Sequence, residues 1–195
     1  MNEEYLVYFD TEFTGLRKDT SIISIGLIDS MGRELYIEFS DYDKSQVDEW
    51  INKNVISNLS KPETNTMNQY FWNISCKKRE AVNYILRWLK PIVDTGKYIQ
   101  FVSDVSHYDM VLLLDLLIPD GKTAIDIPDY ISPCCLDINQ ELANYLNISL
   151  KEAFNINRDE FASEKCNFNY SAKKHNSLYD AKVIKCIYEK IKNIK

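Results

Sequence analysis

The sequence has few of the side chains that build a zinc site or a set of disulfide cross-links. Its five cysteines are an odd number and are scattered over the chain. No two of them are spaced as C-x-x-C, and only two histidines are present to complete a zinc site. Such cysteines are expected to stay reduced and to pack mostly as small apolar side chains. The sequence therefore argues against both a structural zinc ion and a disulfide-stabilised fold.

Long apolar runs and an excess of positive charge are also missing. No stretch approaches the roughly 20 apolar residues of a membrane span, and the acidic start MNEE is unlike a secretory signal, which favours a cytoplasmic protein without a membrane partner. The formal net charge is −6, so the field of the whole chain does not attract nucleic acid. This argues against a protein that coats the grooves of DNA. An enzyme that binds phosphate through metal ions is not excluded, because the ions supply positive charge locally.

Internal repeats, low-complexity linkers and Gly/Ser-rich hinges are absent as well, so residues 1–195 are predicted to form a single domain. Runs of apolar residues predict four strands, at 5–9, 22–29, 34–40 and 98–104. The first three follow one another closely, so they are expected to form an antiparallel start to the sheet. A weaker pattern allows one more strand within 123–138, where two prolines interrupt it.

Helices are predicted between and after these strands. Apolar residues at helical spacing place them at 43–59, 76–93 and 107–118, and 61–69 is predicted to be a loop. The chain after 138 is predicted to be helical apart from a polar loop at 167–174, and to end in a helix at 177–194. Trp50 belongs to the apolar stripe of the first helix. The buried face of the last one comprises Leu178, Ala181, Ile184, Ile187, Tyr188 and Ile191. We therefore predict an α/β fold with flanking helices, whose mixed sheet begins with three antiparallel strands and continues with parallel ones.

Two carboxylates follow the first predicted strand. Asp10 and Glu12 are two residues apart, so in a strand their side chains point to the same side. Like charges at that spacing repel one another, and burial makes them costlier. The end of a buried strand is a place where α/β sheets bind ligands. Two solvated acids at an exposed strand end explain this stretch equally well.

Two further acids are predicted to lie in the first turns of helices. Asp109 follows Tyr108 at the start of one helix, and Asp180 lies five residues after His175 at the start of another. The helix dipole favours an acid in the first turn, which would explain both residues without any ligand. Asp104, at the end of the preceding strand, competes with Asp109 for a role in a site, although a loop aspartate is the simpler interpretation.

Together these acids form a set that suits divalent cations. Asp10, Glu12, Asp109 and Asp180 offer hard oxygen ligands, which Mg²⁺ and Mn²⁺ prefer. His175 can accept a proton near neutral pH. Four acids and a base are what two-metal hydrolysis of a phosphodiester requires. Bound cations would also explain how Asp10 and Glu12 are tolerated together.

The sequence resembles the DEDDh 3′–5′ exonucleases of the RNase H-like superfamily, among them ribonuclease T and polymerase proofreading subunits. The stretches DTEFTGL, HYDMVLL and HNSLYDA match the three motifs of that family, in the same order, over residues 10–180. Asn176 stands where the tyrosine-using branch has Tyr, which indicates the histidine branch. Within that branch the chain is most similar to the compact bacterial and phage-type exoribonucleases. Val105 departs from the family, which usually has Asn at that position.

This resemblance implies an RNase H-like fold and an enzyme that removes nucleotides from the 3′ ends of single-stranded nucleic acid. RNA would be favoured over DNA, nucleoside 5′-monophosphates would be released, and two Mg²⁺ or Mn²⁺ ions would bind per site. The implied metal ligands are Asp10, Glu12, Asp109 and Asp180, with His175 as the general base. The residues implied to contact the substrate are Thr14, Gly15, Leu16 and Tyr108.

Two alternative functions stay open on the sequence. One is a DNA-directed proofreading or editing exonuclease, which would work within a larger complex. The other is a catalytically idle module that binds nucleic acid, which the intact set of five catalytic residues disfavours. The choice between RNA and DNA depends on contacts with the 2′-hydroxyl that no short motif announces. A homodimer is compatible with the sequence but is not indicated by it.

Overall fold

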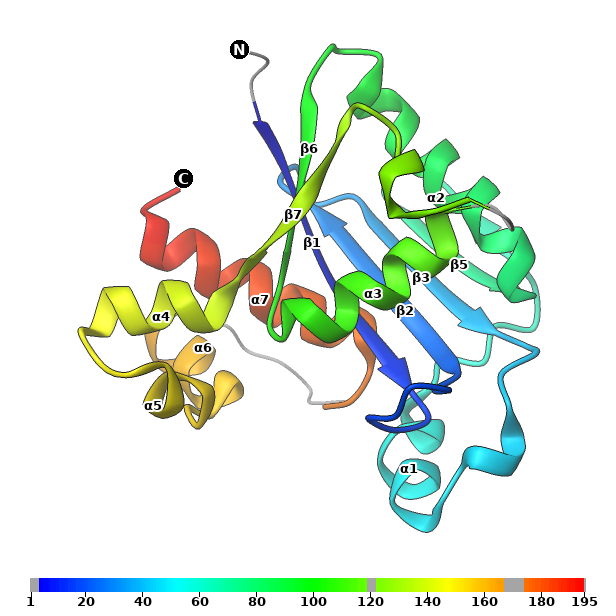
Figure 1. Cartoon of the computed structure of the whole chain (residues 1–195), viewed down its shortest axis with the longest axis horizontal. Coiled ribbons are helices and arrows are strands. Elements are labelled where there is room, and N and C mark those ends of the chain that lie inside the picture. The colour runs from blue at the N-terminus through cyan, green and yellow to red at the C-terminus, as the bar shows by residue number, and fades with distance from the viewer. Residues whose placement is uncertain (1–3, 119–121, 167–173, 195) are drawn as a thin grey trace.

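The computed structural model describes residues 4–118, 122–166 and 174–194, and Figure 1 shows their arrangement. Within these residues, seven strands form one sheet in the order β4-β5-β3-β2-β1-β6-β7. The strands are β1 (Glu4–Phe13), β2 (Ile22–Asp29), β3 (Glu34–Phe39), β4 (Thr66–Met67), β5 (Phe71–Cys76), β6 (Tyr98–Ser103) and β7 (Ile131–Asp137). The α-helices are α1 (Glu49–Asn54), α2 (Lys78–Val93), α3 (Ser106–Leu117), α4 (Ile138–Leu146), α5 (Leu150–Phe154), α6 (Arg158–Cys166) and α7 (Ser177–Lys192). Short 3-10 turns lie at Lys44–Gln46, Ile56–Asn58 and Ala124–Asp126. The polar loop predicted at 167–174 lies, except for its last residue, outside the described residues.

The first three strands form the antiparallel start that the sequence predicts. β1 pairs with β2, and β2 with β3, both in antiparallel orientation. β6 then pairs with β1, and β7 with β6, both in parallel. β7 lies where the sequence allows one more strand. Pro133 is tolerated there because β7 is at an edge of the sheet, where a missing N–H need not break the pairing. The predicted fold class is confirmed.

The opposite edge of the sheet differs from the prediction. Residues 61–69, predicted to form a loop, contain β4, and Cys76, predicted to begin a helix, ends β5. β5 pairs in parallel with β3. Only Ile74 and Cys76 of β5 are buried, so no clear alternating pattern marks it in the sequence. Pairing with β3, which is a long-range contact, makes this segment a strand.

The helix predicted at 43–59 is wrong in its length, because α1 is short and is flanked by two 3-10 turns. Asp48 explains where α1 begins. Its side chain accepts a hydrogen bond from the backbone N–H of Ile51 at 2.8 Å, so it caps a new helix instead of continuing an earlier one. Trp50, assigned by the sequence pattern to a buried stripe, is 56% exposed.

Helices cover both faces of the sheet (Figure 1). α2 and α3 pack against one face, in a core that includes Val7 and Phe9 of β1. α4 to α7 form the second core with Tyr8 of β1 and Val102 of β6. The predicted buried face of α7 is confirmed, since each of its six residues is buried. None of the helices in the described part of the chain is long and apolar enough to cross a membrane.

Candidate active site

The end of β1 carries two acids on an edge that β6 does not cover. β6 pairs with β1 only from Glu4 to Tyr8, whereas the pairing of β1 with β2 continues to Phe13. Asp10 and Glu12 therefore lie beyond the end of β6, with their side chains on the same side of the strand. The starts of α3 and α7 lie at this end of the sheet as well (Figure 1). Three segments that are distant in sequence thus meet here.

Gly26 of β2 allows α7 to approach the sheet closely. Gly26 is the partner of Asp10 in the β1–β2 pairing. A Cβ atom built on Gly26 would lie 2.3 Å from the backbone of Leu178, closer than any real contact. The hydroxyl groups of Ser24 and Ser177 are 3.0 Å apart and hydrogen-bonded beside this contact. The start of α7 is therefore fixed directly against β2, across from Asp10.

His175 lies in the turn that leads into α7, with a backbone φ of +62° that residues other than glycine rarely adopt. Its backbone N–H donates to Asp180 Oδ2 at 3.0 Å. Asn58 connects the turn to the rest of the molecule. Its side-chain amide donates to the carbonyl oxygen of Lys174 at 2.8 Å, and its own carbonyl accepts from Asn176, the cap of α7, at 3.0 Å. Backbone strain that the surroundings hold in this way is common at functional sites.

The side chain of His175 lies among the acids. One potential ligand atom from each of Glu12, His175 and Asp180 lies within 4.8 Å of the other two. The ring also packs edge to face against Trp50, with ring centroids 5.1 Å apart. Burial and the neighbouring ammonium group of Lys174 lower the pKa of His175 below its ordinary value of 6.5. The imidazole is therefore mostly neutral at pH 7.

Asp109 is held in place by Thr11, the residue between the two acids of β1. The backbone N–H and the hydroxyl of Thr11 both donate to Asp109 Oδ1, at 3.2 and 2.6 Å. Since α3 begins just after β6, these two bonds fix the first turn of α3 against the uncovered edge of β1. Asp109 itself is buried.

Each of the four acids lies in surroundings that disfavour its charge. Burial, followed by the carboxylates of Asp109, Asp180 and Glu12, raises the pKa of Asp10 well above its usual value. Burial and the neighbouring acids raise the pKa of Glu12 to about 9. The pKa values of Asp109 and Asp180 rise to about 7, mainly through burial. Among residues 4–118, 122–166 and 174–194, no lysine or arginine forms an ion pair with any of these acids.

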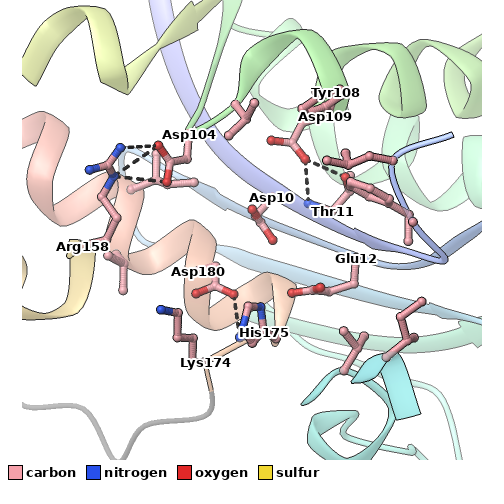
Figure 2. A pocket seen from close by; sticks show the side chains of 18 of the residues that line it. Asp10, Thr11, Glu12, Asp104, Tyr108, Asp109, Arg158, Lys174, His175 and Asp180 are labelled. Atoms are coloured by element: carbon pink, nitrogen blue, oxygen red, sulfur yellow. Dashed lines mark hydrogen bonds and ion pairs between the residues drawn. The ribbon is translucent and has the colours of Figure 1, made fainter. Parts of the chain in front are cut away.

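This excess of negative charge fits a site for divalent cations. Figure 2 shows Asp10 between Asp109 on one side and Asp180 and Glu12 on the other. All four offer hard oxygen atoms, the ligands that Mg²⁺ and Mn²⁺ prefer. Cations bound among them would offset the repulsion that raises their pKa values. The arrangement can therefore hold metal ions beside a neutral imidazole.

Asp104 lies in a different electrostatic environment. Its carboxylate forms an ion pair with Arg158 at 2.9 Å, and Figure 2 shows this pair to one side of the four acids. Arg158 also donates to the backbone carbonyls of Ala153 and Ile156, so it ties the end of β6 to the segment between α5 and α6. Asp104 thus has a cationic partner, whereas Asp109 has none among the described residues. The charge of Asp104 still contributes to the raised pKa values of Asp10, Asp109 and Asp180.

The four acids and His175 line a cavity with a volume of about 840 Å³. The residues that the sequence implies as substrate contacts, Thr14, Gly15, Leu16 and Tyr108, line this cavity as well. Leu16 is 67% exposed and Tyr108 is 40% exposed, so both have accessible surface. Gly15 has a φ of +136°, a conformation that requires glycine. Thr14 is fully buried, and its hydroxyl donates to the side chain of Gln46, so it supports the loop after β1. Contact of these residues with a nucleotide stays a prediction.

Several residues that shape the site were missed by sequence reasoning. They are Thr11, Gly26, Asn58, Trp50 and Arg158. For Gly26 a signal existed, because it is the one glycine within a predicted strand, and such a glycine often marks a close backbone approach. Asn58 and Arg158 have no such signal, since their partners are remote in sequence.

Comparisons with known proteins agree with the fold. No family model and no curated protein sequence matches the chain. Fifteen chains of solved structures match it. One is a 3′-exonuclease, described with the 3′-end specific recognition of a histone mRNA stem-loop, which matches with a TM-score of 0.62 and 12% sequence identity. The match covers 94% of this chain and 62% of that one, so this chain spans less than two thirds of the neighbour's length. At this identity the likeness shows a shared fold.

Proposed function

We propose that this chain is a single exonuclease domain that removes nucleotides from the 3′ ends of single-stranded nucleic acid. The observation that carries the proposal is the convergence of Asp10, Glu12, Asp109 and Asp180, without cationic partners among the described residues, beside the ring of His175. The likeness to a 3′-exonuclease structure supports the same activity.

The four acids would hold two Mg²⁺ or Mn²⁺ ions. When bound, such ions lower the pKa of a water molecule and stabilise the charge on the leaving oxygen. His175, neutral because of its lowered pKa, would accept the proton that the attacking water loses. The hydrogen bonds of Thr11 keep the Asp109 carboxylate oriented. Water attacks the terminal phosphodiester and the bond to the upstream 3′-oxygen breaks. A nucleoside 5′-monophosphate is released, and the shortened strand leaves with a 3′-hydroxyl after its 3′-oxygen takes up a proton from solvent.

RNA is the substrate that we favour. The neighbouring exonuclease structure is described with an mRNA stem-loop, and the chain resembles the compact bacterial and phage-type exoribonucleases most. The exposed side chains of Leu16 and Tyr108 at the cavity would contact the base and sugar of the terminal nucleotide. A cytoplasmic location is part of the same prediction. A DNA proofreading exonuclease is the second candidate, and the substrate test below separates the two.

The test uses the purified protein with oligonucleotides of one sequence as RNA and as DNA, labelled at the 5′ end, with Mg²⁺, Mn²⁺ or EDTA. We expect a ladder of products shortened from the 3′ end, faster on RNA, with 5′-monophosphates released and no cleavage in EDTA. Asp10→Asn should be inactive, while Asp94→Asn, at the C-terminal cap of α2 and paired with Lys90, should retain full activity. Cleavage in EDTA, or of a circular substrate, would overturn the proposal, and binding without any cleavage would indicate an idle module.

A further inference from the structure

A second cavity, of about 580 Å³, adjoins the candidate active site. The two cavities share five lining residues: Phe13, Gly15, Leu16, Arg17 and Tyr108. The rest of the second cavity is formed by Lys18 and Thr20, after β1, and by His107, Val111, Leu112 and Asp115 of α3. Leu16 and Tyr108 therefore separate two adjacent depressions at the same end of the sheet.

The charges that line the second cavity differ from those of the first. Two cations, Arg17 and Lys18, line it, and Asp115, its one carboxylate, is paired with Lys78. Neither Arg17 nor Lys18 forms an ion pair with a carboxylate in the part of the chain that the structure describes. In a chain with a net charge of −6, this is a local surplus of positive charge directly beside a cluster of acids.

Apolar and aromatic side chains line the same cavity as these cations. Val111 is 64% exposed, and the rings of His107 and Tyr108 lie 4.2 Å apart, tilted against each other. Leu16, also exposed, faces this cavity and the active site alike. Aromatic side chains that can stack on bases, next to cations that can contact phosphates, are the combination with which proteins bind a single strand.

Resting on the exonuclease function proposed above, we propose that the second cavity binds the nucleotides that precede the terminal one. Lys18 and Arg17 would contact their phosphates, and His107 would face their bases. Tyr108, in the wall that the two cavities share, would lie between these bases and the terminal nucleotide. A strand whose 3′ end occupies the acidic cavity has to leave it across one of its walls. The walls at the start of α1 and of α6 carry the acids Asp48 and Asp159. The cation of α6, Arg158, is paired with Asp104, and Lys174 lies nearby. The wall shared with the second cavity carries Arg17, which has no carboxylate partner among the described residues. The polyanion would therefore leave over Leu16 and Tyr108.

The test compares two substrates that share the terminal nucleotide. In a nucleoside 5′-(p-nitrophenyl phosphate), p-nitrophenol replaces the upstream strand, so this substrate cannot reach the second cavity, whereas a pentanucleotide can. Lys18→Ala should lower the ratio of kcat/KM for the pentanucleotide to kcat/KM for the ester by about 3- to 10-fold. It should also reduce the salt slope of log(kcat/KM) for the pentanucleotide by about 0.7, the value for one phosphate contact with a single strand. Lys190→Ala is the matched control, because Lys190 lies in the last turn of α7, at the end of the helix away from the candidate active site.

The outcomes separate this inference from the proposed function. If wild-type protein hydrolyses neither substrate with Mg²⁺ or Mn²⁺, the exonuclease function is wrong. If it hydrolyses both, and Lys18→Ala leaves the ratio and the salt slope as they are in Lys190→Ala, the second cavity is not the path of the strand. Equal losses of kcat/KM on the ester and the pentanucleotide in Lys18→Ala would also overturn the inference about the second cavity, because they would place Lys18 at the terminal nucleotide.

Discussion

At the scale of single residues, His175 combines a strained backbone with a depressed pKa. We expect His175→Asn to lower kcat by about 10²–10⁴-fold, the usual range for the loss of a general base. Only the neutral imidazole accepts a proton, so the wild-type rate should fall as the pH drops through the pKa of His175, which lies below 6.5. The pH–rate profile of the variant should lack this acidic limb.

Metal affinity serves as the control for His175, because its ring lies near Glu12 and Asp180. The four carboxylates remain in His175→Asn, so calorimetric titration with Mn²⁺ should give nearly the wild-type affinity. A variant that loses metal binding would make the histidine a ligand, and a variant with the wild-type rate and pH profile would leave it no catalytic role.

Asp10 provides the second prediction at this scale. Without cations its half-buried carboxylate is repelled by four others, those of Asp109, Asp180, Glu12 and Asp104. Asp10→Asn should therefore leave the melting temperature in EDTA unchanged or raise it, while turnover is abolished. Asp29→Asn is the matched control. Asp29 is fully buried but paired with Arg33 at 2.7 Å, and losing that partner should lower the melting temperature clearly. A comparable loss in Asp10→Asn would show that Asp10 is structural.

The candidate residues could be predicted because each motif is local. Asp10 and Glu12 share one strand end, and His175 and Asp180 share one turn, so short stretches of sequence define them. The support around them is not local. Thr11 acts on Asp109, and Asn58 on the turn of His175, through contacts between remote segments. Such contacts exist only once the fold has formed, so the sequence gives no signal for them.

At the scale of elements, the placement of α7 against β2 depends on Gly26. A methyl group there would meet the backbone of Leu178 at 2.3 Å, and backbone cannot rotate away as a side chain can. We expect Gly26→Ala to shift α7, to lower the free energy of unfolding by roughly 1–3 kcal/mol or more, and to abolish activity. Denaturant unfolding and the exonuclease assay measure the two effects.

Gly32→Ala is the control for this prediction. Gly32 has a φ of +84°, and a methyl group added to it would have no atom within 4 Å, so alanine there adds backbone strain without moving a helix. It should cost some stability and leave kcat close to wild type. If Gly26→Ala also retains its activity, the close approach of α7 is not what positions Asp180.

Elements with strong local patterns were predictable, and those that depend on partners were not. All six residues that the pattern of α7 assigns to its buried face are buried, because one side of a long helix packs on the sheet. Ser177 and Val183 are buried as well and were not predicted. α1 is shorter than its apolar pattern indicates, since the cap of Asp48 interrupts the segment. β5 has two buried residues and becomes a strand by pairing with β3. Pairing partners are not encoded in any short window of sequence.

At the scale of the whole molecule, the acid cluster links stability to pH. Consider an acid whose pKa is higher in the folded protein than in the unfolded one. Its contribution to stability is complete at a pH below the pKa of the unfolded state, and it is lost as the pH rises through the pKa of the folded state. For Asp109 and Asp180 that window runs from about 4 to about 7. The lowered pKa of His175 makes stability rise with pH instead. This is the effect of one group, whereas four acids have raised pKa values. The metal-free protein should therefore lose stability as the pH rises to 8.

Mg²⁺ should flatten this dependence, because bound cations favour the ionised acids. The measurement is the melting temperature from pH 5 to pH 8, in EDTA and in excess Mg²⁺, with Asp10→Asn alongside as a variant that carries one acid fewer. We expect the steepest fall for wild type in EDTA. Identical curves with and without Mg²⁺ would mean that the cluster does not bind the ion.

The distance in sequence between β1 and α7, which pack together in the fold, has a consequence for synthesis. As the ribosome makes the chain, β1 and α3 emerge long before α7, so a growing copy carries three of the acids but neither His175 nor Asp180. Closing so long a loop is also slow, because its entropic cost comes before any stabilising contact. We expect the chain to have no nuclease activity until α7 docks. An unfinished copy would then pose no hazard to the message from which it is being translated.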